Sequence, residues 1–238
     1  MVISGSGSLP GGDYMEEVRI SGSGKVNGSV SCTELSISGS GKVCGDLRSE
    51  GKASISGSGS VEGDAQVKEF AVSGSGHVHG ELKGEKCSVA GSFHVGSVSV
   101  QELSSSGYIH VCGDLSAEQA VIRGAIYADG LINAENLDVA FESDSRADSI
   151  GGSTVKIRKK GAVHGLLDRI FKAGKEGTFQ VKGSIEADEI DIEYVEADTV
   201  VGRNVVIGPG CKIKHLSYSE SIKISPEAEV SESSRGEM

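Results

Sequence analysis

The stretch ISGSGKVNGSVSCTELSISGSGKV, residues 20–43, decides the fold, because the same pentapeptide stands at both ends of a repeat. Ile-Ser-Gly-Ser-Gly, or Val-Ser-Gly-Ser-Gly in the last case, starts at Ile3, Ile20, Ile37, Ile55 and Val72. The intervals are therefore 17, 17, 18 and 17 residues. A fixed period of this length is typical of one turn of a solenoid, whose function usually lies on its surface or at its ends.

Aligning the repeats produces columns of like residues. One column contains Ile3, Ile20, Ile37, Ile55, Val72 and Val89, and another contains Leu9, Val26, Val43, Val61, Val78 and Val95. Short runs that alternate apolar and polar residues favour strands, and we expect the Gly-rich elements between them to form turns, where Gly tolerates positive φ. A Gly/Ser linker would not hold Ile and Val at fixed phase. The sequence predicts an all-β fold, a single-stranded parallel β-helix with coils stacked about 4.8 Å apart.

The periodicity is not uniform along the chain. It predicts about eleven short coils with one interruption. We expect N-terminal coils over residues 3–140, a polar and basic insertion or linker over 141–179, C-terminal coils over 180–224 and a frayed polar tail over 225–238.

Composition narrows the possible functions. The 238 residues are 37% hydrophobic and 4% aromatic, with 35 Gly and no Trp, which suits a thin core of β-branched side chains. The net charge of −11 disfavours nucleic acid as a partner, because phosphate binding needs a basic face. Five unevenly spaced Cys suggest reduced thiols and a cytoplasmic location. We see no signal peptide and no apolar stretch that approaches the length of a transmembrane helix.

Two kinds of motif carry a family resemblance. They are the V-x-G-[DSE]-[VL] coils with their Gly-rich corners, and the C-terminal segments IEADEIDIEY (185–194) and VVGRNVVIGPGCKI (200–213). The chain resembles the bactofilins, bacterial polymer-forming cytoskeletal proteins, and in particular the longer proteins of this type from Gram-positive bacteria. The resemblance implies a right-handed β-helix that polymerises end to end without nucleotide. It also implies scaffolding roles in cell shape, envelope assembly or motility.

Candidate chemical sites are weak. His77 and His94 share a column with Lys25, Lys42 and Ser60, so they could bind a divalent metal or titrate near neutral pH, but an exposed polar column explains them as well. No Cys lies in a pattern that suggests a nucleophile. We therefore expect no catalytic residue, no metal and no cofactor.

An enzymatic function is the interpretation that the sequence supports least. Residues 206–213 resemble one hexapeptide repeat of the β-helix acyltransferases, but those enzymes carry many such repeats and a catalytic His. A carbohydrate-active enzyme would need clustered carboxylates, whereas the acidic residues here are scattered. The sequence favours a non-enzymatic structural protein.

The β-helix end is the first candidate surface. The register begins at Ile3, which leaves almost nothing to cover the N-terminal end, and an uncovered end can template another chain. We expect self-association, as a homopolymer or a homodimer, through Ile3, Leu9 and Val18.

A basic cluster is the second candidate surface. Lys156, Arg158, Lys159 and Lys160 precede an apolar run that contains Ile170 and Phe171. In an acidic chain this segment could contact an acidic partner, the inner membrane surface or a neighbouring subunit. A solvated insertion is the plainer alternative. The alternative function is a monomeric or dimeric scaffold that recruits an envelope or motility protein through residues 141–179.

Overall fold

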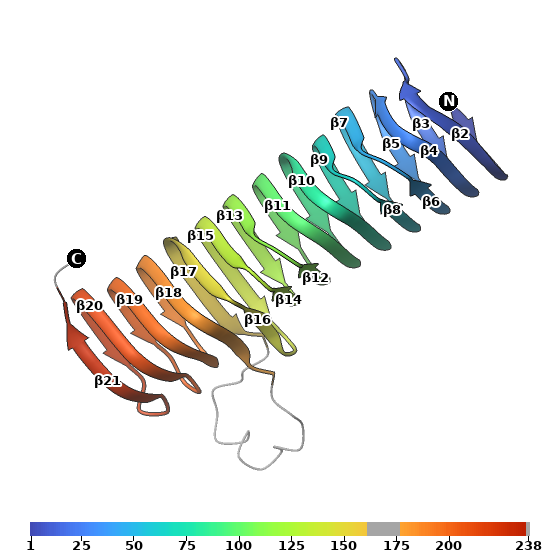
Figure 1. Cartoon of the computed structure of the whole chain (residues 1–238). Coiled ribbons are helices and arrows are strands. Elements are labelled where there is room, and N and C mark those ends of the chain that lie inside the picture. Colours follow the sequence, from blue (N-terminus) through green and yellow to red (C-terminus); the bar gives the residue numbers. More distant parts are fainter. Residues whose placement is uncertain (161–176, 237–238) are drawn as a thin grey trace, which may run out of the picture.

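The computed structural model describes residues 1–160 and 177–236 of the chain, and every regular element in these ranges is a β-strand. Figure 1 shows one elongated stack with the two termini at opposite ends. The strands are β1 (Val2–Ile3), β2 (Ser6–Asp13), β3 (Val18–Ile20), β4 (Ser23–Cys32), β5 (Leu35–Ile37), β6 (Ser40–Val43), β7 (Leu47–Ile55), β8 (Ser58–Val61), β9 (Ala65–Val72), β10 (Ser75–Val89), β11 (Ser92–Ser105), β12 (Tyr108–Val111), β13 (Leu115–Arg123), β14 (Ala125–Ala128), β15 (Leu131–Phe141), β16 (Ser145–Ala147), β17 (Ser149–Lys159), β18 (Phe179–Ile192), β19 (Val195–Ile207), β20 (Lys212–Ile224) and β21 (Glu229–Arg235).

All strand pairs are parallel, and each strand pairs with the strand one turn away. The predicted all-β parallel solenoid is therefore confirmed, with about 13 turns rather than about eleven. The register fixes one core column from end to end: Ile3, Ile20, Ile37, Ile55, Val72, Val89, Ser105, Ile122, Val139, Ile157, Ile192, Ile207 and Ile224.

The additional turns lie where the sequence suggested an insertion and a tail. Strands β16 and β17 continue the solenoid through residues 145–159, and Ile150, Val155 and Ile157 stack on β15. These three apolar residues keep the column phase although polar and basic residues surround them. The interruption is thus narrower than residues 141–179, and the part from 161 to 176 lies outside the described residues. The expected frayed tail contains β21, which pairs with β20.

From the second Ser-Gly-Ser-Gly motif onward, the first glycine of the motif is required by the stacking of the turns. A Cβ placed on Gly39 or Gly57 would overlap the carbonyl oxygen of the glycine one turn earlier. Neither residue has a positive φ, which among the described glycines occurs only at Gly12, Gly28, Gly124 and Gly210. The expectation that these corners need glycine for positive φ is wrong. They need it because neighbouring backbones approach too closely for a side chain.

The second glycine of the motif faces the core. A Cβ on Gly41 would lie 2.8 Å from Cγ2 of Ile37, so the motif couples a bulky Ile with a glycine four residues later. Later in the chain Phe93 occupies this column, directly after Gly76, and its ring centroid lies 5.4 Å from that of Phe70. The core volume that Ile supplies in the early turns is thus supplied partly by Phe where the strict repeat ends.

The Gly-Asp pair of the V-x-G-D motif links successive turns. The N–H of Asp64 donates to Oδ1 of Asp46 (3.0 Å), and the N–H of Glu81 donates to Oδ1 of Asp64 (2.8 Å). A Cβ on Gly63 would overlap the Asp46 carboxylate. The Asp of one turn therefore occupies the space that the Gly of the next turn leaves free, and it satisfies a backbone donor at the corner.

Candidate functional site: the two ends and the outer columns

The N-terminal end consists of β1 and β2, which pair with β3 and β4 and with no other described strand on their outer side. Ile3 and Leu9 lie in this first turn, as predicted, and are 7% and 9% exposed. Val18 does not lie at the end. It belongs to the second turn, pairs with Leu35 and is fully buried, because Met1 forms part of the layer above it.

The C-terminal end leaves more of its apolar core open. Ile224 is 40% exposed, and Ile222, Ala228 and Val230 are only partly buried against the core. The sequence-based prediction considered only the N-terminal end, and it assigned Ala228 and Val230 to a tail over residues 225–238. The sequence does contain a sign of this turn, because Ile222 and Ile224 are two residues apart like Val205 and Ile207, with which they pair.

The predicted basic cluster does not form a free cationic patch. Arg158 forms an ion pair with Asp191, Lys160 with Glu142 at 2.6 Å, and Lys159 lies over the ring of Tyr194. Lys156 is exposed and stands in a column between Asp138 and Asp191. Ile170 and Phe171 lie outside the described residues, so the apolar half of that prediction stays a prediction.

The predicted His column is longer than the sequence indicated. His77 stacks on His79 with ring centroids 4.0 Å apart, and His94 lies 5.8 Å from His77 and 5.5 Å from His110. Burial lowers the pKa of His77 and of His94, and neighbouring imidazoles lower both further. Within residues 1–160 and 177–236, no group of three or more His, Cys, Asp or Glu side chains could hold a metal ion.

The column continues beyond the histidines. Tyr127 follows His110 in the column, and Arg146 follows Tyr127 and lies over its ring at 5.2 Å. Tyr108 belongs to the neighbouring column of Ser92, and its ring centroid lies 5.5 Å from that of Tyr127. Arg146 also forms an ion pair with Asp129 at 2.8 Å, and His110 lies 3.2 Å from the same carboxylate. The stack is thus anchored at its C-terminal side by one acidic residue.

The cysteines divide into core and surface groups. Cys32, Cys87 and Cys211 are buried, and burial raises the pKa of their thiols to about 11, about 12 and about 11. Cys44 is half-buried and Cys112 is exposed. Thiols with pKa values this high remain protonated near neutral pH, so the buried three behave as small apolar residues.

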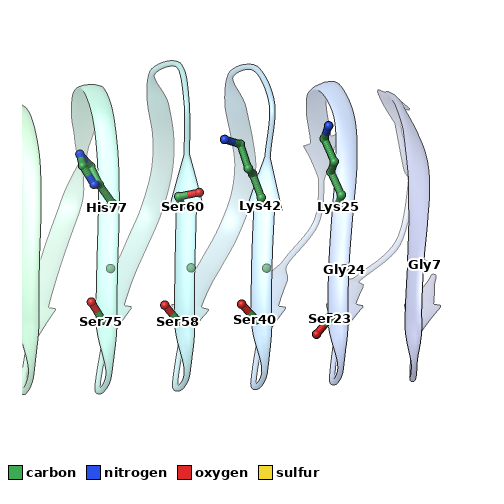
Figure 2. A pocket seen from close by; sticks show the side chains of 13 residues that line it. Gly7, Ser23, Gly24, Lys25, Ser40, Lys42, Ser58, Ser60, Ser75 and His77 are labelled. Carbon is green, nitrogen blue, oxygen red and sulfur yellow. The ribbon is translucent and has the colours of Figure 1, made fainter.

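A shallow groove of about 570 Å³ follows the early turns. Figure 2 shows its walls, a row of Ser side chains on one side and Lys25, Lys42 and His77 on the other, with the glycine positions between them. The groove exists because the inward-facing glycines separate two outward-facing columns. It is a surface feature that repeats with the turns, in contrast to an enclosed substrate cavity.

Comparison with known proteins identifies the repeat. Residues 3–83 match the family model of the bactofilins, described as polymer-forming cytoskeletal. This segment of the chain is similar to a bactofilin domain. The resemblance seen in the sequence is thus confirmed for the turns that contain the Ser-Gly-Ser-Gly motif, and the matched segment ends within β10.

One curated relative extends this comparison. The uncharacterized protein YhbF of Bacillus subtilis (strain 168) is 28% identical over 107 residues, which are 44% of this chain and 42% of YhbF. The match therefore spans less than half of that relative. No solved structure matches the chain. None of the described residues forms a helix long and apolar enough to cross a membrane.

Proposed function

We propose that this protein is a non-enzymatic structural subunit that forms linear polymers by stacking the ends of its β-solenoid. The observation that carries the proposal is that the C-terminal turn leaves apolar core residues open, with Ile224 40% exposed and Ile222 and Val230 only partly buried. Unpaired strand backbones and partly open apolar cores are what another chain needs for edge-to-edge pairing. The polymer-forming description of the bactofilin family supports the same conclusion.

The two ends are compatible because they terminate the same columns. Ile3 begins the column that Ile224 ends, and Leu9 begins the column that Val230 ends. A terminal turn that meets another terminal turn therefore places apolar residues against apolar residues. The C-terminal turn contributes more open apolar surface, since Ile224 is 40% exposed and Ile3 only 7%.

Gly5 supports stacking at the N-terminal end. Its counterparts in later turns, such as Gly22 and Gly39, could not bear a Cβ because the preceding turn lies too close. A Cβ on Gly5 would meet no atom within 4 Å. Glycine is thus not needed at this position for packing within the described chain, whereas a second chain stacked with the same geometry would need it.

Two variants with a matched control test the proposal. Ile224→Asp puts a charge into the C-terminal contact, and Gly5→Ala puts a methyl group into the N-terminal one. Val206→Asp is the control, because Val206 is 37% exposed but faces outward one turn before the end. Negative-stain electron microscopy and sedimentation velocity should show long particles for the wild type and for Val206→Asp. Short particles are expected for the two end variants.

The proposal is wrong if the wild type remains monomeric over a wide concentration range. It is also wrong if both end variants form polymers as long as those of the wild type. Circular dichroism of each variant shows whether the fold is intact. This matters most for Ile224→Asp, whereas Gly5→Ala has no steric reason to disturb the monomer.

A further inference from the structure

Strand β21 pairs with β20 but interrupts an apolar column of the core. The register places Ser233 on Leu216 and Arg235 on Tyr218. From β4 to β20, the column of Leu216 is apolar in every described turn. Its members are Val30, Leu47, Ala65, Leu82, Val98, Leu115, Ile132, Ile150, Ile185, Val200 and Leu216. Strand β21 therefore continues the hydrogen-bonded ladder of the solenoid without continuing its core.

Strand β21 covers only part of the turn that lies beneath it. It pairs with β20 over residues 212–218, and in this range Ile213 and Leu216 are each 2% exposed. Ile224 lies on the same strand β20 but outside the paired range, and it is 40% exposed. Figure 1 shows β21 against β20 at the C-terminal end of the stack. The two buried residues are thus shielded by a strand that offers little apolar surface of its own.

Few side-chain contacts hold β21 in place. Of its seven residues only Val230 is half-buried, and the other six are exposed. Glu232 forms an ion pair with His215 at 2.9 Å, and Nε of Arg235 donates to the carbonyl oxygen of Ser219 at 3.2 Å. Both partners of the ion pair are more than half exposed, and exposed ion pairs contribute little to stability. A strand with so little apolar burial belongs to the elements that open locally at low cost.

A second copy would stack less favourably on β21 than on β20. A turn placed on β21 would bury Ser233 and Arg235 in the core, and a hydroxyl or a charge that is buried without a partner is costly. A turn placed on β20 would instead meet Ile213, Leu216 and Ile224. Its backbone would also replace the ladder hydrogen bonds of β21, because an added strand pairs with the same edge. Strand β21 therefore occupies the better of the two stacking surfaces.

We propose that β21 is an autoinhibitory strap, which covers the edge of β20 on which a terminal turn of a second copy stacks. The inference rests on the proposed end stacking, and it adds the strand that receives the second copy and the step that uncovers it. A site that is open about a tenth of the time binds its partner about tenfold more weakly. The wild type therefore polymerises, but at a concentration on the order of tenfold higher than a chain whose strap is released.

Val230→Asp in the full chain releases the strap. It puts a charge against the core beside Ile213 while β21 is closed, and it costs nothing once β21 is detached in water. In sedimentation velocity, the concentration at which half of the protein is assembled should fall on the order of tenfold. If β21 were itself the stacking surface, the charge would lie in the contact and would weaken assembly, as for Ile224→Asp. Ser234→Asp is the matched control, because Ser234 is exposed and pairs with Ser217 on the outer face, and assembly should not change.

A disulfide between β20 and β21 locks the strap. Ser217→Cys and Ser234→Cys pair in register, and neighbouring strands lie about 4.8 Å apart, within the Cα separation that a disulfide spans. Cys44→Ser and Cys112→Ser remove the thiols that are not fully buried. The oxidised protein should lose its long particles in electron micrographs, and a reductant should restore them. The control joins β19 to β20 by Val201→Cys and Ser217→Cys in the same background, and it should polymerise equally in both states.

Hydrogen exchange measures the strap without any polymer. The amides of β21 should exchange at least about tenfold faster than those of β19, because β21 opens locally. Equal protection would overturn the inference, since it would show that β21 does not detach. Polymers that the oxidised lock does not shorten, or that Val230→Asp weakens, would also overturn it while leaving end stacking intact. If the wild type, Val230→Asp and the reduced lock all stay monomeric at every concentration, the end stacking is wrong and this inference falls with it.

Discussion

Ser105 provides the most direct test of how the core determines stability. It stands in the core column between Val89 and Ile122, is 1% exposed, and its hydroxyl has no hydrogen-bond partner. A buried donor without a partner costs about 1–3 kcal/mol. Ser105→Ala removes this cost and should stabilise the protein by about 1 kcal/mol. Ser105→Val adds two further apolar groups at about 0.8 kcal/mol each and should gain about 2.6 kcal/mol in total.

The assay is urea unfolding followed by circular dichroism, carried out in the Ile224→Asp background so that polymer formation does not contribute. The midpoint should rise for Ser105→Ala and rise further for Ser105→Val. Ser104→Val is the matched control, because Ser104 is the exposed neighbour and faces outward. A Ser105→Ala protein that is no more stable than its parent would refute the reasoning, since alanine cannot overpack the site. A loss of stability confined to Ser105→Val would show instead that the core has no room there.

Further predictions concern the corner, the imidazoles and the thiols. Gly57→Ala should lower the free energy of unfolding by on the order of 3 kcal/mol in urea titrations, because its methyl group overlaps a carbonyl oxygen of the neighbouring turn; an unchanged midpoint would contradict this. The folded pKa of His77 and of His94 lies below the unfolded value of about 6.5, so their contribution to stability is complete above that pH and is lost as the pH falls through the folded pKa. Replacing both with Ser should make the urea midpoint less sensitive to pH between 7.5 and 5.5, and an unaltered pH dependence would argue against it. A thiol reagent at pH 8 should label Cys112 in the native protein, whereas Cys87, with a pKa of about 12, should react only after unfolding.

Much of the fold follows from the sequence because the pentapeptide repeats on a fixed period. The columns of Ile3 and Leu9 were assigned correctly, and the register pairs them as expected. The sequence does not predict the turns between residues 145 and 159, because their corners lack the Ser-Gly-Ser-Gly motif. Ile150 and Ile157 nevertheless occupy the same core columns as the residues of the preceding turn. A prediction of turns that relies on corner residues fails where the corner sequence changes, even when the buried column continues.

The candidate surfaces were less predictable, because they depend on which side chains meet across turns. Lys160 and Glu142 are 18 residues apart and Arg158 and Asp191 are 33 apart, so the neutralisation of the basic cluster is invisible without the register. The imidazole stack was partly visible, since His77 and His94 share a phase. Its extension through Tyr108 to Arg146 depended on turns whose spacing the sequence did not fix.

Sedimentation velocity of the wild-type chain over a concentration series tests the central claim most directly. Stacking of solenoid ends predicts a distribution that shifts to larger species as the concentration rises, with elongated particles in electron micrographs and a reversal on dilution. A single monomeric species at all concentrations, in the absence of any added partner, would contradict the account.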